Sequence, residues 1–219
     1  RHARRVRRHG AALQRGESAL ILVFDEVRSV FLRRAQGMGF ELKPFLDQGL
    51  LHLRQIDPAE LTPGELTAAV RDAVESDGAR IVVLDSLSGY LNAMPEEHFM
   101  MLQMHEMLSY LNQQGVVTIL VLAQHGMVGH MASPVDLTYL SDAVVLLRFF
   151  EAGGKLRRAL SVLKKRTGRH EETIREYRIS ARGIAVGRAL TEFQGVLTGV
   201  PTYIGADSNL LDETNGHGE

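Results

Sequence analysis

The chain has 219 residues, of which 45% are hydrophobic and 23% charged, and its formal net charge is -1. This composition suits one α/β domain with a buried core, and the near-zero charge provides no bulk attraction to nucleic acid or to an acidic membrane, so we expect neither as a partner. The absence of cysteine excludes disulfides and thiolate metal sites and is compatible with the cytoplasmic location that we expect. Apolar runs such as residues 116–123 are too short to cross a bilayer.

Strands and helices are predicted to alternate through the first two thirds of the chain. An Arg-rich surface helix is expected before Gly16, and its arginines are more typical of a solvated helix face than of a nucleic-acid site. Short apolar runs predict strands at 19–24, 50–56, 81–84, 116–122 and 143–147. Apolar residues at helical spacing predict helices over 27–35, 62–77 and 96–114.

Two of the predicted helices carry further information. Thr62 and Glu65 have the spacing of a capping box, with Pro63 at the first helical position, so a helix is expected to begin there. The helix over 96–114 is rich in methionine, and we favour packing on the sheet over an adaptable partner surface. The histidines lack a compact ligand spacing, so no transition-metal site is assigned to His98, His105, His125 and His130.

The pattern changes after Gly153-Gly154. Short strands are expected at 156–163, 173–179 and 184–186, joined as antiparallel hairpins. The polar residues 206–219 are expected to form a disordered tail, which leaves 1–205 as the folded core. The predicted fold is therefore α/β: a mostly parallel sheet flanked by helices, with an antiparallel edge and C-terminal hairpins.

Polar residues follow three of the predicted parallel strands. The first strand ends in Asp25-Glu26, another in Asp85-Ser86, and the strand over 116–122 is followed by Gln124. Because the carboxyl ends of parallel strands share one rim of a sheet, these groups would hold Mg²⁺ with its waters and orient an attacking water. Acidic residues in such places also stabilise the N-termini of the following helices, but three coincident strand ends favour a site.

Four segments, in this order, resemble a known family. Residues 22–26 (Leu-Val-Phe-Asp-Glu) look like the acidic strand of KaiC-like ATPase domains of the RecA superfamily, and 81–87 (Ile-Val-Val-Leu-Asp-Ser-Leu) like their Walker B strand. Residues 162–170 contain the Leu-Lys-x-Arg and following His of the family's basic segment, and 195–201 (Gly-Val-Leu-Thr-Gly-Val-Pro) resemble the segment that closes the domain. The resemblance implies a RecA-like fold over about residues 15–201.

The resemblance also implies roles for residues. Glu26 and Asp25 match the acidic pair that activates the hydrolytic water; the family usually has Glu at both positions, and the shorter Asp25 makes Glu26 the favoured base. Asp85 would position Mg²⁺ through water, with Ser86 and Gln124 near the nucleotide. The positions that face the ATP of a neighbouring subunit in a ring are matched by Lys164, Arg166 and His170.

The phosphate-binding loop of such domains is absent from the 219 residues. A P-loop reads Gly-x-x-x-x-Gly-Lys-Ser/Thr because backbone amides, the Lys and the hydroxyl hold the phosphates and Mg²⁺. The only Gly-Lys pair is Gly154-Lys155, with no hydroxyl residue after it. Since the chain begins with Arg1 rather than Met, we expect a fragment, a processed product or an incomplete reading of a longer protein, with the loop just before Arg1.

Three functions follow. The first is a KaiC-like P-loop NTPase domain that uses ATP and Mg²⁺ between subunits of a homo-oligomer, which the family makes a hexameric ring, and that is incomplete as it stands. The second is a non-catalytic RecA-fold module that binds protein partners. The third is a DNA-recombination ATPase of the same superfamily, which the near-neutral charge and the C-terminal hairpins disfavour.

Overall fold

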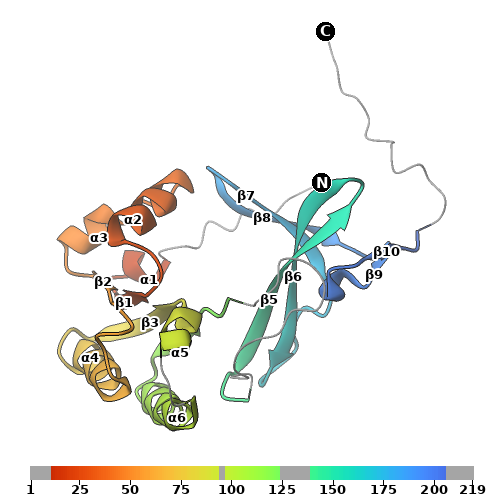
Figure 1. Cartoon of the computed structure of the whole chain (residues 1–219). Coiled ribbons are helices and arrows are strands. Elements are labelled where there is room, and N and C mark those ends of the chain that lie inside the picture. The colour runs from red at the N-terminus through yellow and green to blue at the C-terminus, as the bar shows by residue number, and fades with distance from the viewer. Residues whose placement is uncertain (1–10, 94–96, 124–138, 206–219) are drawn as a thin grey trace.

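The structure is a computed structural model that describes residues 11–93, 97–123 and 139–205 (Figure 1). The expectations for the Arg-rich segment before residue 11, for Gln124, His125 and His130, and for the tail lie outside the described residues. No helix in the described ranges has the length and apolar character needed to span a membrane.

A four-stranded parallel sheet forms the centre of the N-terminal part. Its strands lie in the order β2-β1-β3-β4, and each neighbouring pair is parallel. Their bounds are Ser18–Val23 for β1, Leu51–Gln55 for β2, Ala79–Asp85 for β3 and Val117–Leu120 for β4. The predicted parallel sheet is confirmed, and β1 and β3 lie side by side at its centre.

Helices cover both faces of this sheet, as Figure 1 shows. Their bounds are Ala11–Gln14 for α1, Arg28–Gly37 for α2, Lys43–Asp47 for α3, Pro63–Glu75 for α4, Leu87–Ala93 for α5 and Glu97–Gln113 for α6. Alternate residues of β1 point to opposite faces, so Leu20 and Leu22 pack toward α4 and α6 while Ala19 packs toward α1 and α3. The methionines of α6 are buried on the sheet, as predicted: Met100, Met104 and Met107.

Helix α4 begins where its sequence predicts. The Thr62 hydroxyl accepts a hydrogen bond from the Glu65 N–H at 3.3 Å, and a Glu65 carboxylate oxygen accepts one from the Thr62 N–H at 2.9 Å. Pro63 occupies the first turn, where its missing N–H costs nothing. This reciprocal cap confirms the predicted capping box.

The C-terminal strands form a separate antiparallel sheet with the order β5-β6-β7-β8. The strands run over Ala143–Ala152, Lys155–Lys165, Arg175–Ser180 and Gly183–Ala189, followed by η1 (Val196–Thr198) between the short strands β9 (Phe193–Gln194) and β10 (Thr202–Tyr203). The hairpins are confirmed, but they are not an edge of the parallel sheet. The reason is the tight turn at Gly153 and Gly154, whose φ angles of 60° and 65° suit a primed turn and let β5 and β6 pair along their whole length.

Two further contacts involve the end of α2 and the segment that contains η1. At the end of α2, a Cβ on Gly39 would lie 2.8 Å from the Ala181 carbonyl oxygen in the β7–β8 turn, so the two parts of the chain touch there (Figure 1). Val196 of η1 is buried against Phe150 and Ala159, so residues 195–201 pack on the antiparallel sheet.

Candidate active site at the carboxyl ends of strands β1 and β3

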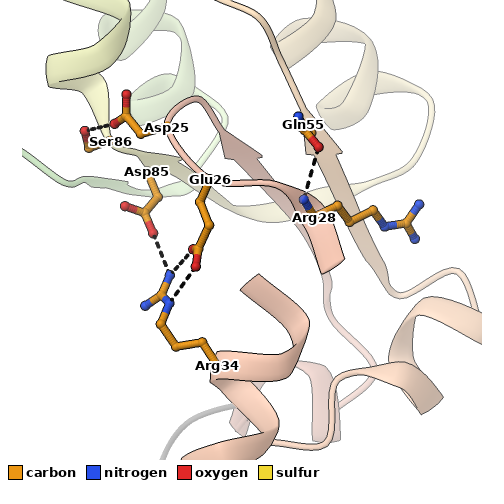
Figure 2. A network of polar contacts seen from close by, with 7 residues as sticks. All are labelled: Asp25, Glu26, Arg28, Arg34, Gln55, Asp85 and Ser86. Carbon is orange, nitrogen blue, oxygen red and sulfur yellow. Dashed lines mark hydrogen bonds and ion pairs between the residues drawn. The ribbon is translucent and has the colours of Figure 1, made fainter. Parts of the chain in front are cut away.

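Asp25 and Glu26 follow β1 directly but point in different directions (Figure 2). The Asp25 carboxylate turns toward α5, where it accepts a hydrogen bond from the Ser86 hydroxyl. It also lies against the backbone of Gly89, with no room for a Cβ at that position. Asp25 is therefore fixed by the residues that follow β3.

Glu26 points instead to α2 and forms a bidentate ion pair with Arg34. Arg34 Nη2 lies 2.6 Å from one carboxylate oxygen of Glu26, and Arg34 Nε lies 3.2 Å from the other. The same Nη2 lies 3.8 Å from a carboxylate oxygen of Asp85, the last residue of β3. Arg34 thus lies between the ends of β1 and β3, as Figure 2 shows.

The electrostatics of the rim follow from this arrangement. Burial raises the pKa of the Asp85 carboxyl; Arg34 opposes this, and the nearby charges of Glu26 and Asp25 add to it. The hydrogen-bonded pair with Glu26 raises the pKa of Arg34 above its ordinary value. The side chains of Glu26 and Asp85 are only 23% and 29% exposed, so their charges are partly shielded from water.

Two further contacts position the elements around the rim. The Gln55 side chain, at the end of β2, accepts a hydrogen bond from the Arg28 N–H at 3.1 Å, which satisfies a free donor in the first turn of α2. The Ser88 hydroxyl accepts from the Ala123 N–H at 2.9 Å and donates to the Ala123 carbonyl at 3.1 Å. Ser88 thereby connects α5 to the chain that leaves β4.

The rim does not contain a complete set of protein ligands for a metal ion. Among the described residues, no group of three or more His, Asp or Glu side chains lies close enough to hold one. Asp25 accepts a hydrogen bond from Ser86 and points away from Glu26 (Figure 2), and one carboxylate oxygen of Asp85 lies 3.8 Å from Arg34. Mg²⁺ commonly keeps several of its waters and binds through one or two carboxylates plus phosphates, so Asp85 fits such an ion through water.

Comparison with known proteins places this geometry in a family. The family model described as "ATPase: KaiC" matches residues 9–191. The chain belongs to the KaiC ATPase family. It is 26% identical over 204 residues to the circadian clock protein KaiC3 of a Synechocystis species, covering 90% of this chain and 40% of that protein.

Other KaiC proteins are similar at the same level. The circadian clock oscillator protein KaiC of a Picosynechococcus species is 24% identical over 195 residues, covering 89% of this chain and 38% of that protein. KaiC of Synechococcus elongatus is 23% identical over 192 residues, covering 87% of this chain and 37% of that protein. The chain therefore spans about two fifths of the length of these KaiC proteins.

The basic residues suggested by the KaiC resemblance lie in the last part of β6 and in the segment that follows it. Lys164 is half-buried in β6, which runs two residues past the predicted end at residue 163, and Arg166 lies one residue after the strand. Arg166 Nη2 donates to the Tyr139 carbonyl at 2.6 Å, and Nη1 lies 3.5 Å from Asp142. His170 follows in the segment between β6 and β7.

The structure also reveals residues of the rim that sequence reasoning in this KaiC-family chain missed: Arg34, Ser88 and Gly89. Arg34 stands eight residues after Glu26, across a bend and two turns of helix, so no short spacing rule pairs them. Gly89 lies inside α5, which was not predicted, and its role depends on the approach of Asp25 from another strand. A glycine within the short apolar segment after β3 is the signal that the sequence offers.

Proposed function

We propose that this chain is the core of a KaiC-type ATPase domain that binds ATP and Mg²⁺ at the rim formed by β1 and β3. The observation that supports this most is the convergence of Glu26 and Asp85 on one cation, Arg34, at the carboxyl ends of neighbouring parallel strands. In parallel sheets ligands bind beyond these strand ends. The family membership and the half-buried acidic rim point to the same place.

Within the acidic pair, Glu26 is the proposed general base. Asp25 is held by Ser86 and packs against Gly89, which is the environment of a structural carboxylate. Glu26 bonds Arg34 instead, and a carboxylate that accepts two bonds from an Arg still has lone pairs for a water. Asp85 is proposed to orient Mg²⁺ through its waters, with Ser86 and Gln124 beside the nucleotide.

The phosphates need a P-loop, which the 219 residues do not contain. We propose that a longer form of the protein carries this loop ahead of Arg1, that the domain runs to residue 205, and that residues 206–219 are a tail. We further propose a cytoplasmic homo-oligomer, a hexameric ring, in which three residues reach the ATP of the next subunit: Lys164, Arg166 and His170. The exposed position of Arg166 is compatible with such a contact.

A non-catalytic interaction module is the second candidate, and one observation favours it. The chain has the sheet and the acidic rim but no P-loop, so as it stands it can keep the family's surfaces without its catalysis. The two candidates differ in what a longer form would do with ATP.

Calorimetry with ATP and Mg²⁺ separates them. We expect the 219-residue chain to bind ATP weakly, because three phosphate groups would face an acidic rim without the amides and Lys of a P-loop. A form with a P-loop ahead of Arg1 should bind at micromolar concentration and release phosphate. Micromolar binding by the 219-residue chain would contradict the role given to the loop, and tight binding without hydrolysis by the longer form would favour the interaction module.

A further inference from the structure

Arg34 differs from an ordinary surface ion-pair residue in what it contacts. Its guanidinium bonds both oxygens of Glu26 and lies 3.8 Å from Asp85, so one cation serves two carboxylates from neighbouring strands. These carboxylates are 23% and 29% exposed, compared with 61% for Asp47 in the surface pair with Lys43. Bidentate Arg–carboxylate pairs in which the carboxylate is partly buried are among the stronger ion pairs.

The helix that carries Arg34 is lightly packed. Ala35 is the one buried residue of α2. Val27, at the N-cap of α2, is 54% exposed, and Val30, in its first turn, is 44% exposed. The pair with Glu26 and the Gln55 bond to the Arg28 N–H are the polar contacts that attach the described part of α2 near the rim. Arg34 can withdraw from Asp85 without opening the core of the sheet.

The contact with Asp85 is the weaker of the two. At 3.8 Å it is an ion pair without a hydrogen bond, whereas the Glu26 contact has two. A doubly charged ion with its waters near Asp85 would meet the guanidinium at the same carboxylate, and two cations at one carboxylate repel each other.

We propose that Arg34 is the internal counter-cation of the Glu26–Asp85 pair and competes with a divalent cation for this rim. When the cation approaches Asp85, the ion pair between Arg34 and Asp85 breaks, and the pair between Arg34 and Glu26 remains. Arrival of the metal is thereby coupled to the position of the base and of α2. This inference rests on the proposed function only in taking Asp85 as the carboxylate that faces Mg²⁺.

The test uses Mn²⁺ as the probe and needs no nucleotide. Paramagnetic resonance titration of the 219-residue chain measures the Mn²⁺ affinity of Arg34→Gln against the unchanged chain. Removing one positive charge about 4 Å from a carboxylate is worth about fivefold in water, so the affinity of Arg34→Gln should rise by about this factor. Arg33→Gln is the matched control, because it removes the same charge from the next, exposed position of α2.

Two more variants separate local competition from other effects. Arg34→Lys keeps the charge, so its Mn²⁺ affinity should stay near that of the unchanged chain. Adding Asp85→Asn to Arg34→Gln should abolish the gain, because the contested carboxylate is gone. Thermal unfolding gives a second readout: Mg²⁺ should raise the melting temperature of Arg34→Gln more than NaCl of the same ionic strength does.

Equal Mn²⁺ affinities for Arg34→Gln, Arg33→Gln and the unchanged chain would overturn the proposal, as would a gain that survives Asp85→Asn. If Arg34→Gln does not fold, a gain in Arg34→Lys as large as about fivefold would also count against charge competition. Failure of the longer form to hydrolyse ATP would refute the proposed function and leave these titrations unaffected.

Discussion

The Asp25 carboxylate occupies the space that any side chain on Gly89 would need. Asp25 follows β1, whereas Gly89 lies in α5, which follows β3. The Ser86 hydroxyl donates a hydrogen bond to the Asp25 carboxylate at this place (Figure 2). The close approach of a carboxylate to a helix backbone explains a glycine within α5, where glycine otherwise weakens a helix.

Gly89→Ala should therefore destabilise the protein by about 1–3 kcal/mol, as overpacking of a tight site does. Urea unfolding measures the change. Gly64→Ala is the matched control, because Gly64 lies in α4 with open space around its Cα and should gain about 0.5–1 kcal/mol from the lower entropy of the unfolded chain. Equal effects of the two substitutions would show that Asp25 does not depend on Gly89.

The two members of the acidic pair should differ in catalysis. In a form with a P-loop, Glu26→Gln should slow ATP turnover by about a hundredfold to ten-thousandfold, because an amide cannot take a proton from water. ATP binding should stay nearly unchanged, since size and shape are kept. Asp25→Asn should cost less, because an amide oxygen still accepts the Ser86 bond. Greater damage from Asp25→Asn, in turnover at saturating ATP, would reverse the assignment.

Asp85 should make stability depend on pH. Burial raises the pKa of this carboxyl in the folded state, so its charged form costs stability above that pKa. The cost disappears as pH falls through the folded pKa toward the unfolded one. Asp85→Asn should thus be more stable than the unchanged chain at neutral pH, by up to about 1 kcal/mol, with an advantage that shrinks on acidification. Urea unfolding across pH tests this, with Glu41→Gln as a substitution of the same kind at an exposed position.

Arg166 is expected to act on the neighbouring subunit. Its ion pair with Asp142 is exposed, so Arg166→Ala should lower stability by no more than about 1 kcal/mol. In a P-loop-bearing ring it should nevertheless reduce turnover strongly, since a cation supplied to the phosphates in trans is worth on the order of a thousandfold or more.

Mixed rings test whether the contact is made in trans. Combining Arg166→Ala subunits with Glu26→Gln subunits should restore part of the ATP turnover, because some junctions then pair an intact base with intact cations. Subunits that assemble but recover no activity would place Arg166 within its own subunit's chemistry or outside the reaction.

Local signals predicted the four parallel strands, the start of α4 and the acidic strand ends, but not the short helices α3 and α5. Alternating and continuous apolar runs predicted β1 to β4, and the Thr62–Glu65 spacing predicted the start of α4, because these patterns depend on neighbours within a few residues. Since parallel strands share one rim, the sequence also predicts that Asp25, Glu26 and Asp85 lie at the same edge of the sheet.

Only the tertiary structure decided how those carboxylates are used. In the structure Asp25 contacts Ser86 and Gly89, whereas Glu26 pairs with Arg34. Strand β5 belongs to a second, antiparallel sheet. The physical reason is that side-chain direction at a bend, the reach of an Arg across a helix and the choice between two sheets depend on packing between distant segments. Residue spacing alone does not determine that packing.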